Sequence, residues 1–155
     1  MGHELLPSKM NGTDFDTLNQ QGDYSLNRYS RSKLANILFT KALARQRAKE
    51  RVYVNVAHPG LVTTEIGRSS KDMMGTVGDK TGQLLNAVMA YSTEEGALTQ
   101  LYLATSLEIE NRDVRGRYFI PIANEIQTSA YARDEESQDK LWTFSEKLVR
   151  EKVKA

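Results

Sequence analysis

The chain has 155 residues, of which 26% are charged, and its formal net charge is +1. This length suits one domain, and the near balance of charges gives no field that would attract nucleic acid. The chain contains no cysteine, which excludes disulfides and thiolate metal sites, and its two histidines, His3 and His58, are far apart in sequence. We therefore expect neither a metal site nor a nucleic-acid partner.

The sequence also lacks signals that would direct it into a membrane. No run of residues approaches the roughly 18 apolar residues of a membrane-spanning helix. The first residues do not show the basic stretch followed by an apolar stretch that marks a secretory signal. We expect a cytoplasmic protein with no membrane segment in this chain.

The chain begins with a predicted loop and continues into a long helix. Residues 1–24 read as loop, because Asn11-Gly12 is a strong turn signal. From about Leu26 to Ala48, apolar residues recur at helical spacing and leave polar residues on the opposite side. This pattern predicts an amphipathic helix whose apolar face packs in the core or, alternatively, against a partner.

Near the start of this helix, a phenol and an ammonium group lie four residues apart. Residues at this spacing share one helix face, with Cβ atoms about 5–6 Å apart, so Tyr29 and Lys33 can point at one ligand. A neighbouring positive charge favours a phenolate, which is what a phenolic general acid or base needs. The alternative is a half-buried tyrosine beside a solvated lysine.

A strand and a turn follow the helix. Residues 52–57 are rich in β-branched side chains and are followed by Pro59-Gly60. The order of helix and then strand favours a parallel sheet with crossover connections, in which ligands bind outside the carboxyl ends of the strands. The loop after Ala57 lies at such an end, although Pro-Gly is also compatible with an ordinary turn.

Residues 64–91 contain several glycines together with Met73 and Met74. Methionine adapts to irregular ligands, so this region is compatible with a loop that closes over a substrate. It is equally compatible with an unspecific flexible loop, and it does not identify a substrate.

The remainder, residues 92–155, reads as helix, strand and helix. Ser92 and Glu95 form a capping box for a helix that runs to about Leu107. A strand is expected at residues 117–122, with Pro121 at an edge or at the strand's end, because proline has no N–H. The last helix is expected at about residues 135–152. The inward residues predicted for these two helices are Ala97, Leu98, Leu101, Tyr102 and Ala104 in the first, and Leu141, Phe144, Leu148 and Val149 in the second, with Trp142 near the rim.

Two motifs in the first half carry a family resemblance. Residues 29–39 read Tyr-Ser-Arg-Ser-Lys-Leu-Ala-Asn-Ile-Leu-Phe, and residues 58–62 read His-Pro-Gly-Leu-Val. Together they resemble the C-terminal half of a short-chain dehydrogenase/reductase. The likeness is to the subgroup that contains retinol-dehydrogenase-like enzymes and related fungal short-chain reductases, and it extends over almost the whole chain.

The resemblance implies an α/β fold, namely the C-terminal half of a doubly wound, Rossmann-like parallel sheet. The family binds its dinucleotide on an N-terminal βαβ unit with a Gly-x-x-x-Gly-x-Gly turn, and no such turn occurs in this sequence. We also find no counterpart of the family's catalytic serine and asparagine. We therefore expect one partial domain over residues 1–155, truncated before the tyrosine helix, with residues 25–63 as the catalytic helix and following strand.

The same resemblance implies an oxidoreductase that transfers a hydride between a nicotinamide and a carbonyl or alcohol substrate. Tyr29 would exchange the proton with the substrate oxygen. Lys33 would favour the phenolate and hold the nicotinamide ribose, so that both residues are catalytic and bind the cofactor. NADP is commoner than NAD among the relatives that the resemblance suggests.

The loop after the first strand would complete the cofactor site. By resemblance, Pro59 and Gly60 shape this loop beside the nicotinamide, whereas Val62 and Thr63 meet its carboxamide. No metal ligand is implied.

Because the cofactor-binding half and the serine are not found, we expect the chain by itself to be inactive. Acid–base help from a Tyr–Lys pair would contribute only about 10²–10⁴-fold. The alternative is a non-catalytic fragment that acts as a binding or regulatory partner of a full-length relative. A dimer through the helix of residues 26–48 is implied by the resemblance.

Overall fold

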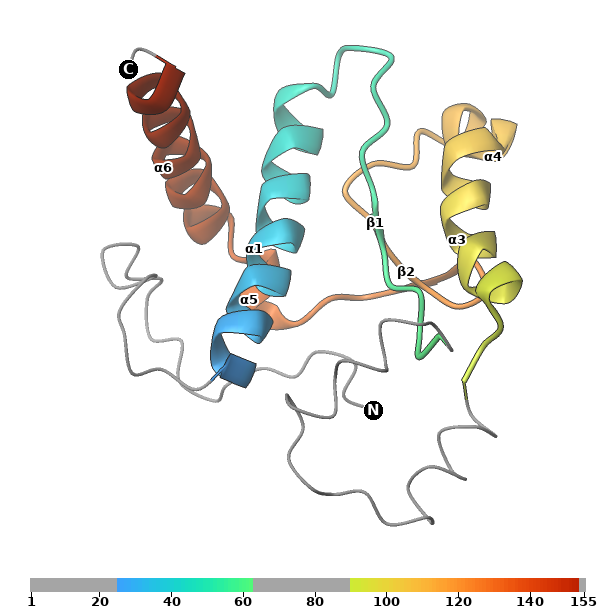
Figure 1. Cartoon of the computed structure of the whole chain (residues 1–155). Helices are drawn as coiled ribbons and strands as arrows, with labels where there is room; N and C mark the ends of the chain where they lie inside the picture. Colours follow the sequence, from blue (N-terminus) through green and yellow to red (C-terminus); the bar gives the residue numbers. More distant parts are fainter. Residues whose placement is uncertain (1–24, 63–89, 154–155) are drawn as a thin grey trace.

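The computed structural model describes residues 25–62 and 90–153 (Figure 1). The loop predicted at residues 1–24, the substrate loop predicted at residues 64–91, except for Ala90 and Tyr91, and Thr63 lie outside the described residues. The elements are α1 (Ser25–Gln46), β1 (Val56–Ala57), α3 (Thr93–Thr105), α4 (Leu107–Asn111), β2 (Tyr118–Ile120), β3 (Asn124–Ile126), α5 (Ala130–Arg133) and α6 (Glu135–Val153).

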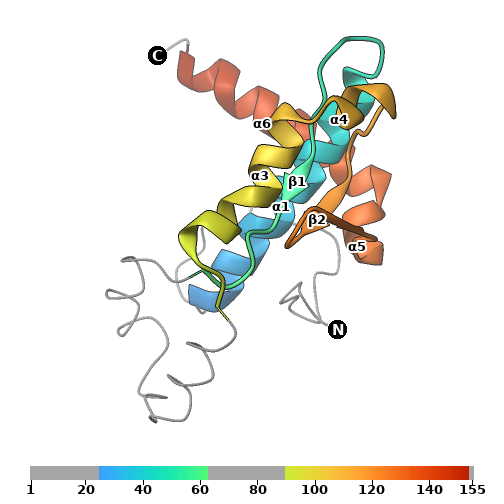
Figure 2. The same cartoon turned by 90° about the vertical axis from the view of Figure 1, so that its right-hand side faces the viewer.

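A small sheet separates two groups of helices. Its strand order is β1-β2-β3, with β1 and β2 parallel and β2 and β3 antiparallel. The helices α1, α5 and α6 lie on one side of this sheet and α3 and α4 on the other (Figures 1 and 2). The parallel pair agrees with the expectation from helix-then-strand order, whereas the antiparallel strand β3 was not predicted.

The first two residues of β2 supply the two halves of the core. Tyr118 belongs to the cluster on the α1 side, and Phe119 belongs to a cluster with Ile109 and Val114 on the α3 side. Successive side chains of a strand point to opposite faces, so one short strand can serve both layers. The structure is thus a mixed α/β arrangement with helices on both faces of the sheet.

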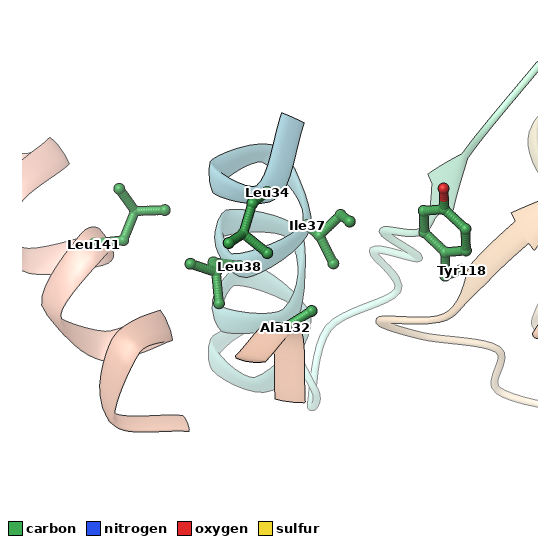
Figure 3. Close-up of a cluster of buried hydrophobic side chains, with 6 residues drawn as sticks. All are labelled: Leu34, Ile37, Leu38, Tyr118, Ala132 and Leu141. Carbon is green, nitrogen blue, oxygen red and sulfur yellow. The ribbon is translucent and has the colours of Figure 1, made fainter. Parts of the chain in front are cut away.

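The α1 side holds the larger core cluster. Leu34, Ile37 and Leu38 recur at helical spacing on α1 and are buried together with Ala132 of α5 and Leu141 of α6 (Figure 3). This confirms the apolar face that the sequence predicted for the first helix. The observed bounds differ from the predicted ones by only one or two residues at each end.

The first strand is shorter than the predicted residues 52–57. Beside β1, the Asn55 side chain takes over part of the pairing: its Nδ2 donates to the Val114 carbonyl at 2.8 Å, and its Oδ1 accepts from the Arg117 N–H at 3.0 Å. Side-chain bonds of this kind offer the backbone an alternative to the sheet ladder. The assigned strand covers Val56 and Ala57. Single backbone bonds continue beyond it at both ends, since the Gly116 N–H donates to the Val54 carbonyl and the His58 N–H to the Phe119 carbonyl, each at 2.8 Å.

The second predicted strand ends earlier than residue 122. The ladder of β2 ends at Ile120, directly before Pro121, which has no N–H to donate. The chain then turns, with Ala123 at a positive φ of 51°, and returns as β3. Proline at the strand's end was predicted, but the return strand was not.

The prediction for the inward face of α3 was wrong in part. The capping box is present, since the Ser92 Oγ accepts from the Glu95 N–H and the Glu95 carboxylate accepts from the Ser92 N–H. However, Leu98 and Leu101 are exposed, and the buried residues are Gly96 and Thr99. Gly96 has no Cβ, which allows Val62 to approach the helix closely and turns the row of Gly96 and Thr99 inward.

The predicted stripe of α6 is buried only in its first half. Leu141 lies in the core, and Trp142 stacks on Phe39 of α1 with ring centroids 5.1 Å apart. Leu148 and Val149 are exposed, which corrects the prediction, because the C-terminal half of α6 diverges from α1 (Figure 1). Within the described ranges, no helix has the length and apolar character required to cross a membrane.

Candidate functional site

The structure places Tyr29 and Lys33 together on an exposed part of α1. The Lys33 Nζ lies 5.3 Å from the centre of the Tyr29 ring, within the range of a cation–π contact. Tyr29 is 47% exposed, and Lys33 is exposed as well, so both polar ends remain accessible to a ligand. Tyr29 and Lys33 therefore lie on one face of the helix, as the sequence predicted, and neither side chain is buried in the core.

The local structure explains why this part of α1 holds its place. Ser30 and Leu34, which lie about 100° around the helix from Tyr29 and Lys33 respectively, are buried. The Ser32 hydroxyl donates to the Tyr29 carbonyl at 2.7 Å within the same turn. The buried side anchors the helix, and the first turns present Tyr29 and Lys33 outward.

The loop after β1 has a specific shape. The His58 N–H donates to the Phe119 carbonyl at 2.8 Å, which continues the parallel pairing one residue beyond β1. The ring Nδ1 of His58 accepts from the Gly60 N–H at 2.8 Å and closes a tight turn around Pro59. Gly60 adopts a φ of +78°, a conformation that side chains other than glycine disfavour.

Gly60 is also required for close packing. A Cβ at this position would lie 2.8 Å from both the Pro121 and the Tyr91 side chains. Pro121 follows β2, so the ends of two parallel strands meet at this loop. The Pro59-Gly60 turn is thus built into the carboxyl edge of the sheet.

A second connection fastens the loop to the start of α3. The Tyr91 N–H donates to the Leu61 carbonyl at 2.8 Å, and Val62 and Tyr91 form an isolated parallel bridge. Behind them, the buried Thr99 hydroxyl accepts from the Ala123 N–H at 3.1 Å. From the sequence, no roles were predicted for Tyr91, Gly96 or Thr99. Gly96 could have been noticed, because a glycine in the first turn of a well-capped helix often marks a close contact.

These parts share one edge of the molecule. The chain enters α1 at the same end at which it leaves β1, because α1 and β1 run in opposite directions (Figures 1 and 2). Ligands of open α/β sheets bind at the carboxyl ends of the strands. The arrangement can therefore present the Tyr29–Lys33 pair and the loop after β1 at the same edge of the sheet. Thr63, which was predicted to belong to this loop, lies outside the described residues.

Other features of the described part lie away from this edge. A hollow of about 300 Å³ is bordered by Phe39, Trp142 and Val149, between α1 and α6. In residues 25–62 and 90–153, no group of three histidine, aspartate or glutamate side chains converges as a metal site would require. The hollow is not part of the Tyr29 edge, because Phe39 lies ten residues, or about 15 Å of helix, beyond Tyr29.

Comparison with known proteins places these features in a family. Residues 17–75 match the family described as short chain dehydrogenase. Human retinol dehydrogenase 14 is 41% identical over 142 residues, which are 91% of this chain and 41% of that protein. No solved structure matches the chain significantly.

Relatives from a plant and a fungus extend the comparison. The chloroplastic short-chain dehydrogenase TIC 32 A of Brassica napus is 36% identical over 141 residues, covering 89% of this chain and 42% of that protein. The short-chain dehydrogenase/reductase drtF of Aspergillus calidoustus is 30% identical over 159 residues, covering 97% of this chain and 48% of that protein. The chain spans less than half the length of these relatives. The matched family segment contains the Tyr29–Lys33 pair and the loop after β1, and the chain belongs to the short-chain dehydrogenase family.

Proposed function

We propose that this chain carries the acid–base pair and part of the nicotinamide site of an NAD(P)-dependent oxidoreductase acting on a carbonyl or alcohol. The observation that supports this most directly is the Lys33 ammonium 5.3 Å from the exposed Tyr29 ring. The pair lies at the edge where the strands end, and the family to which the chain belongs is one of dehydrogenases.

Tyr29 is the proton carrier in this proposal. In the reducing direction its hydroxyl donates a proton to the oxygen of the substrate carbonyl, and in the oxidising direction the phenolate accepts that proton. Lys33 stabilises the phenolate through its positive charge. An acid–base pair of this kind contributes about 10²–10⁴-fold to a rate.

The residues present fit one end of a nicotinamide cofactor. When bound, the cofactor supplies or accepts the hydride. The exposed Tyr29 hydroxyl and Lys33 ammonium are suited to the ribose hydroxyls. The turn at Pro59 and Gly60 presents backbone close to the same edge, and Val62 and Thr63 are proposed to border the carboxamide. It is also part of this proposal that the cofactor is NADP rather than NAD. The same holds for the fold, in which the described strands would form the C-terminal half of the doubly wound sheet of the family.

A titration with matched variants tests the proposal. We expect NADPH or NADH to quench the fluorescence of the purified chain saturably and weakly. Lys33→Ala should weaken binding about tenfold, the value of one charged hydrogen bond. Lys140→Ala is the control, because Lys140 is exposed on α6 and pairs with Glu136 at 2.6 Å. No binding up to millimolar cofactor would contradict the proposal for this chain.

A second assay addresses turnover. We expect no hydride transfer by the 155-residue chain alone, since its sequence contains no Gly-x-x-x-Gly-x-Gly turn. Turnover that Tyr29→Phe abolishes would refute that expectation and strengthen the role of Tyr29. Tyr131→Phe is a matched control, because Tyr131 is 48% exposed, close to the 47% of Tyr29, but lies on α5.

A second candidate function is that of a non-catalytic partner of a full-length relative. Leu98, Leu101 and Leu107 are exposed on α3 and α4, and β1 has a strand neighbour on only one side among the described residues. Both features suit association with further protein. Stable co-elution with an intact relative, without turnover, would favour this function. A further proposed contact is α1, on which Phe39 is exposed. A cytoplasmic location stays a prediction.

A further inference from the structure

The loop after β1 contains a side chain to which the proposed function gives no role. His58 follows the last residue of β1, and its backbone N–H donates to the Phe119 carbonyl at 2.8 Å. Its half-buried ring lies against the next residues of the loop, where Nδ1 accepts from the Gly60 N–H at 2.8 Å. His58 therefore joins the end of the parallel strand pair to the turn that follows.

The direction of this hydrogen bond defines the form of the ring. A backbone N–H only donates, so Nδ1 takes part with its lone pair. The imidazole in this arrangement is neutral and carries its proton on Nε2. A protonated ring donates from both nitrogens and accepts at neither, so the bond requires the neutral ring.

Gly60 needs such a restraint more than the other residues of the loop. Glycine has the widest conformational freedom of all residues and loses the most entropy when it is fixed. A larger residue does not fit here, because its Cβ would lie 2.8 Å from Pro121 and Tyr91 at a φ of +78°. The most flexible kind of residue thus stands at a tightly packed place, and the His58 bond restrains it.

The two ends of the turn are fixed without the ring. On one side, the His58 N–H is bonded to Phe119, and on the other, the Tyr91 N–H donates to the Leu61 carbonyl at 2.8 Å. The bond from Gly60 to the His58 ring lies between these two attachments. It therefore sets the orientation of the Gly60 peptide rather than the position of the whole loop.

We propose that His58 is a positioning residue of the nicotinamide site, whose Nδ1 holds the Gly60 amide so that the loop after β1 has its binding shape before the cofactor arrives. This inference rests on the proposed function, in which this loop borders the nicotinamide. A loop that is already ordered loses less conformational entropy on binding, and its affinity for the ligand is higher for that reason. His58 has this effect without touching the cofactor.

Three substitutions separate this role from a general effect of the ring. In His58→Asn, the side-chain oxygen is as many bonds from the backbone as Nδ1 of histidine, and asparagine readily accepts from the N–H two residues on. His58→Gln has the same amide group one methylene further out, and His58→Phe keeps a ring without an acceptor. We expect the turn to be preserved in the first variant and loosened in the other two.

Fluorescence titration with NADPH and NADH at pH 8, where an ordinary imidazole is neutral, compares these variants with the unaltered chain. His58→Gln and His58→Phe should bind about tenfold more weakly, which corresponds to one hydrogen bond. His58→Asn should bind as the unaltered chain does. Circular dichroism checks the fold, and if His58→Phe does not fold, the matched pair His58→Asn and His58→Gln decides the comparison.

A second readout needs no cofactor. In the isotope-labelled chain, nuclear magnetic resonance should detect scalar coupling between the Gly60 amide nitrogen and the His58 Nδ1, which a hydrogen bond between two nitrogens transmits. Hydrogen exchange of the Gly60 amide should be faster in His58→Gln and His58→Phe than in His58→Asn. Absence of the coupling, or equal exchange in His58→Asn and His58→Gln, would overturn the inference.

The two readouts distinguish this inference from the proposed function. If the unaltered chain binds cofactor and His58→Gln and His58→Phe bind it equally well, the positioning role is refuted and the proposed function stands. If the unaltered chain binds neither cofactor, the proposed function is refuted for this chain. The role of His58 toward the cofactor then falls with it, even where the coupling to Gly60 is detected.

Discussion

On one face of the sheet, α1 buries Leu34, Ile37 and Leu38 against α5 and α6, whereas on the other face α3 leaves Leu98 and Leu101 exposed. The first face is held by apolar area removed from water. The second has a smaller apolar cluster around Ile109, Val114 and Phe119, and the start of α3 is held there by a cap and a glycine contact. This difference indicates that the α1 layer is completed by the described residues. The α3 layer, and the side of β1 that has no strand neighbour among the described residues, suit additional protein.

The largest expected effect compares one leucine from each face. Leu38 is 2% exposed and Leu101 is 54% exposed. Leu38→Ala should lower the free energy of unfolding by about 2–5 kcal/mol, because it removes buried methyl groups and leaves a cavity. Leu101→Ala should change it by at most about 0.5 kcal/mol. Urea unfolding measures both; similar losses would mean that α3 is buried in solution.

The next effect concerns the loop that joins the two layers. Gly60→Ala should destabilise the chain by more than about 1 kcal/mol, since Gly60 has a φ of +78° and its new Cβ would meet Pro121 and Tyr91 at 2.8 Å. Gly116→Ala is the comparison, because Gly116 has a φ of +64° but its nearest neighbour, the Ala44 Cβ, is 3.3 Å away. Thermal unfolding should rank Gly60→Ala as the more destabilising; the reverse order would contradict the packing described.

A smaller effect is expected at the cap of α3. Because α3 buries little apolar surface, the capping box at its N-terminus should contribute measurably to the stability of the helix. Ser92→Ala removes the side chain that accepts from the Glu95 N–H and should cost about 1 kcal/mol. Thr105→Ala, at the other end of the same helix, is the control. Amide hydrogen exchange along α3 provides the measurement, and unchanged protection in Ser92→Ala would exclude a stabilising role of the cap.

The smallest expected effect is a dependence on pH at the start of α6. Hydrogen bonds from the Ser137 hydroxyl and then from its backbone N–H hold the pKa of Asp134 below its ordinary value of 3.8. A carboxyl group whose pKa is lowered by folding stabilises the fold above that ordinary value. Its contribution is lost as the pH falls through the lower, folded pKa.

The variant Asp134→Asn tests this dependence, because asparagine also caps helices but does not titrate. The stability of the unaltered chain relative to this variant should be constant above pH 5 or so and should fall on further acidification. Urea unfolding at a series of pH values measures the difference. A difference that does not change with pH would show that the Asp134 carboxylate contributes nothing specific.

Several elements could be predicted because their signals are local. The apolar spacing of α1, the capping box at Ser92 and the stop at Pro121 each depend on residues that are close in sequence. The same holds for the Tyr29–Lys33 pair, since four residues in a helix set its geometry. The short β1 was not predictable in this way, because the Asn55 side chain bonds to Val114 and Arg117, far along the chain.

The sequence by itself determined the three long helices α1, α3 and α6, where α3 starts and which two side chains share the exposed face of α1, because spacing and capping act within one or two turns. The short helices α4 and α5 were not predicted. Only the tertiary structure decided that Gly60 packs on Pro121 and Tyr91, that Gly96 and not Leu98 faces inward, and that Lys41 donates to the Gly116 carbonyl. These relations join residues from different elements. They follow from how closely whole elements approach one another, which local patterns do not specify.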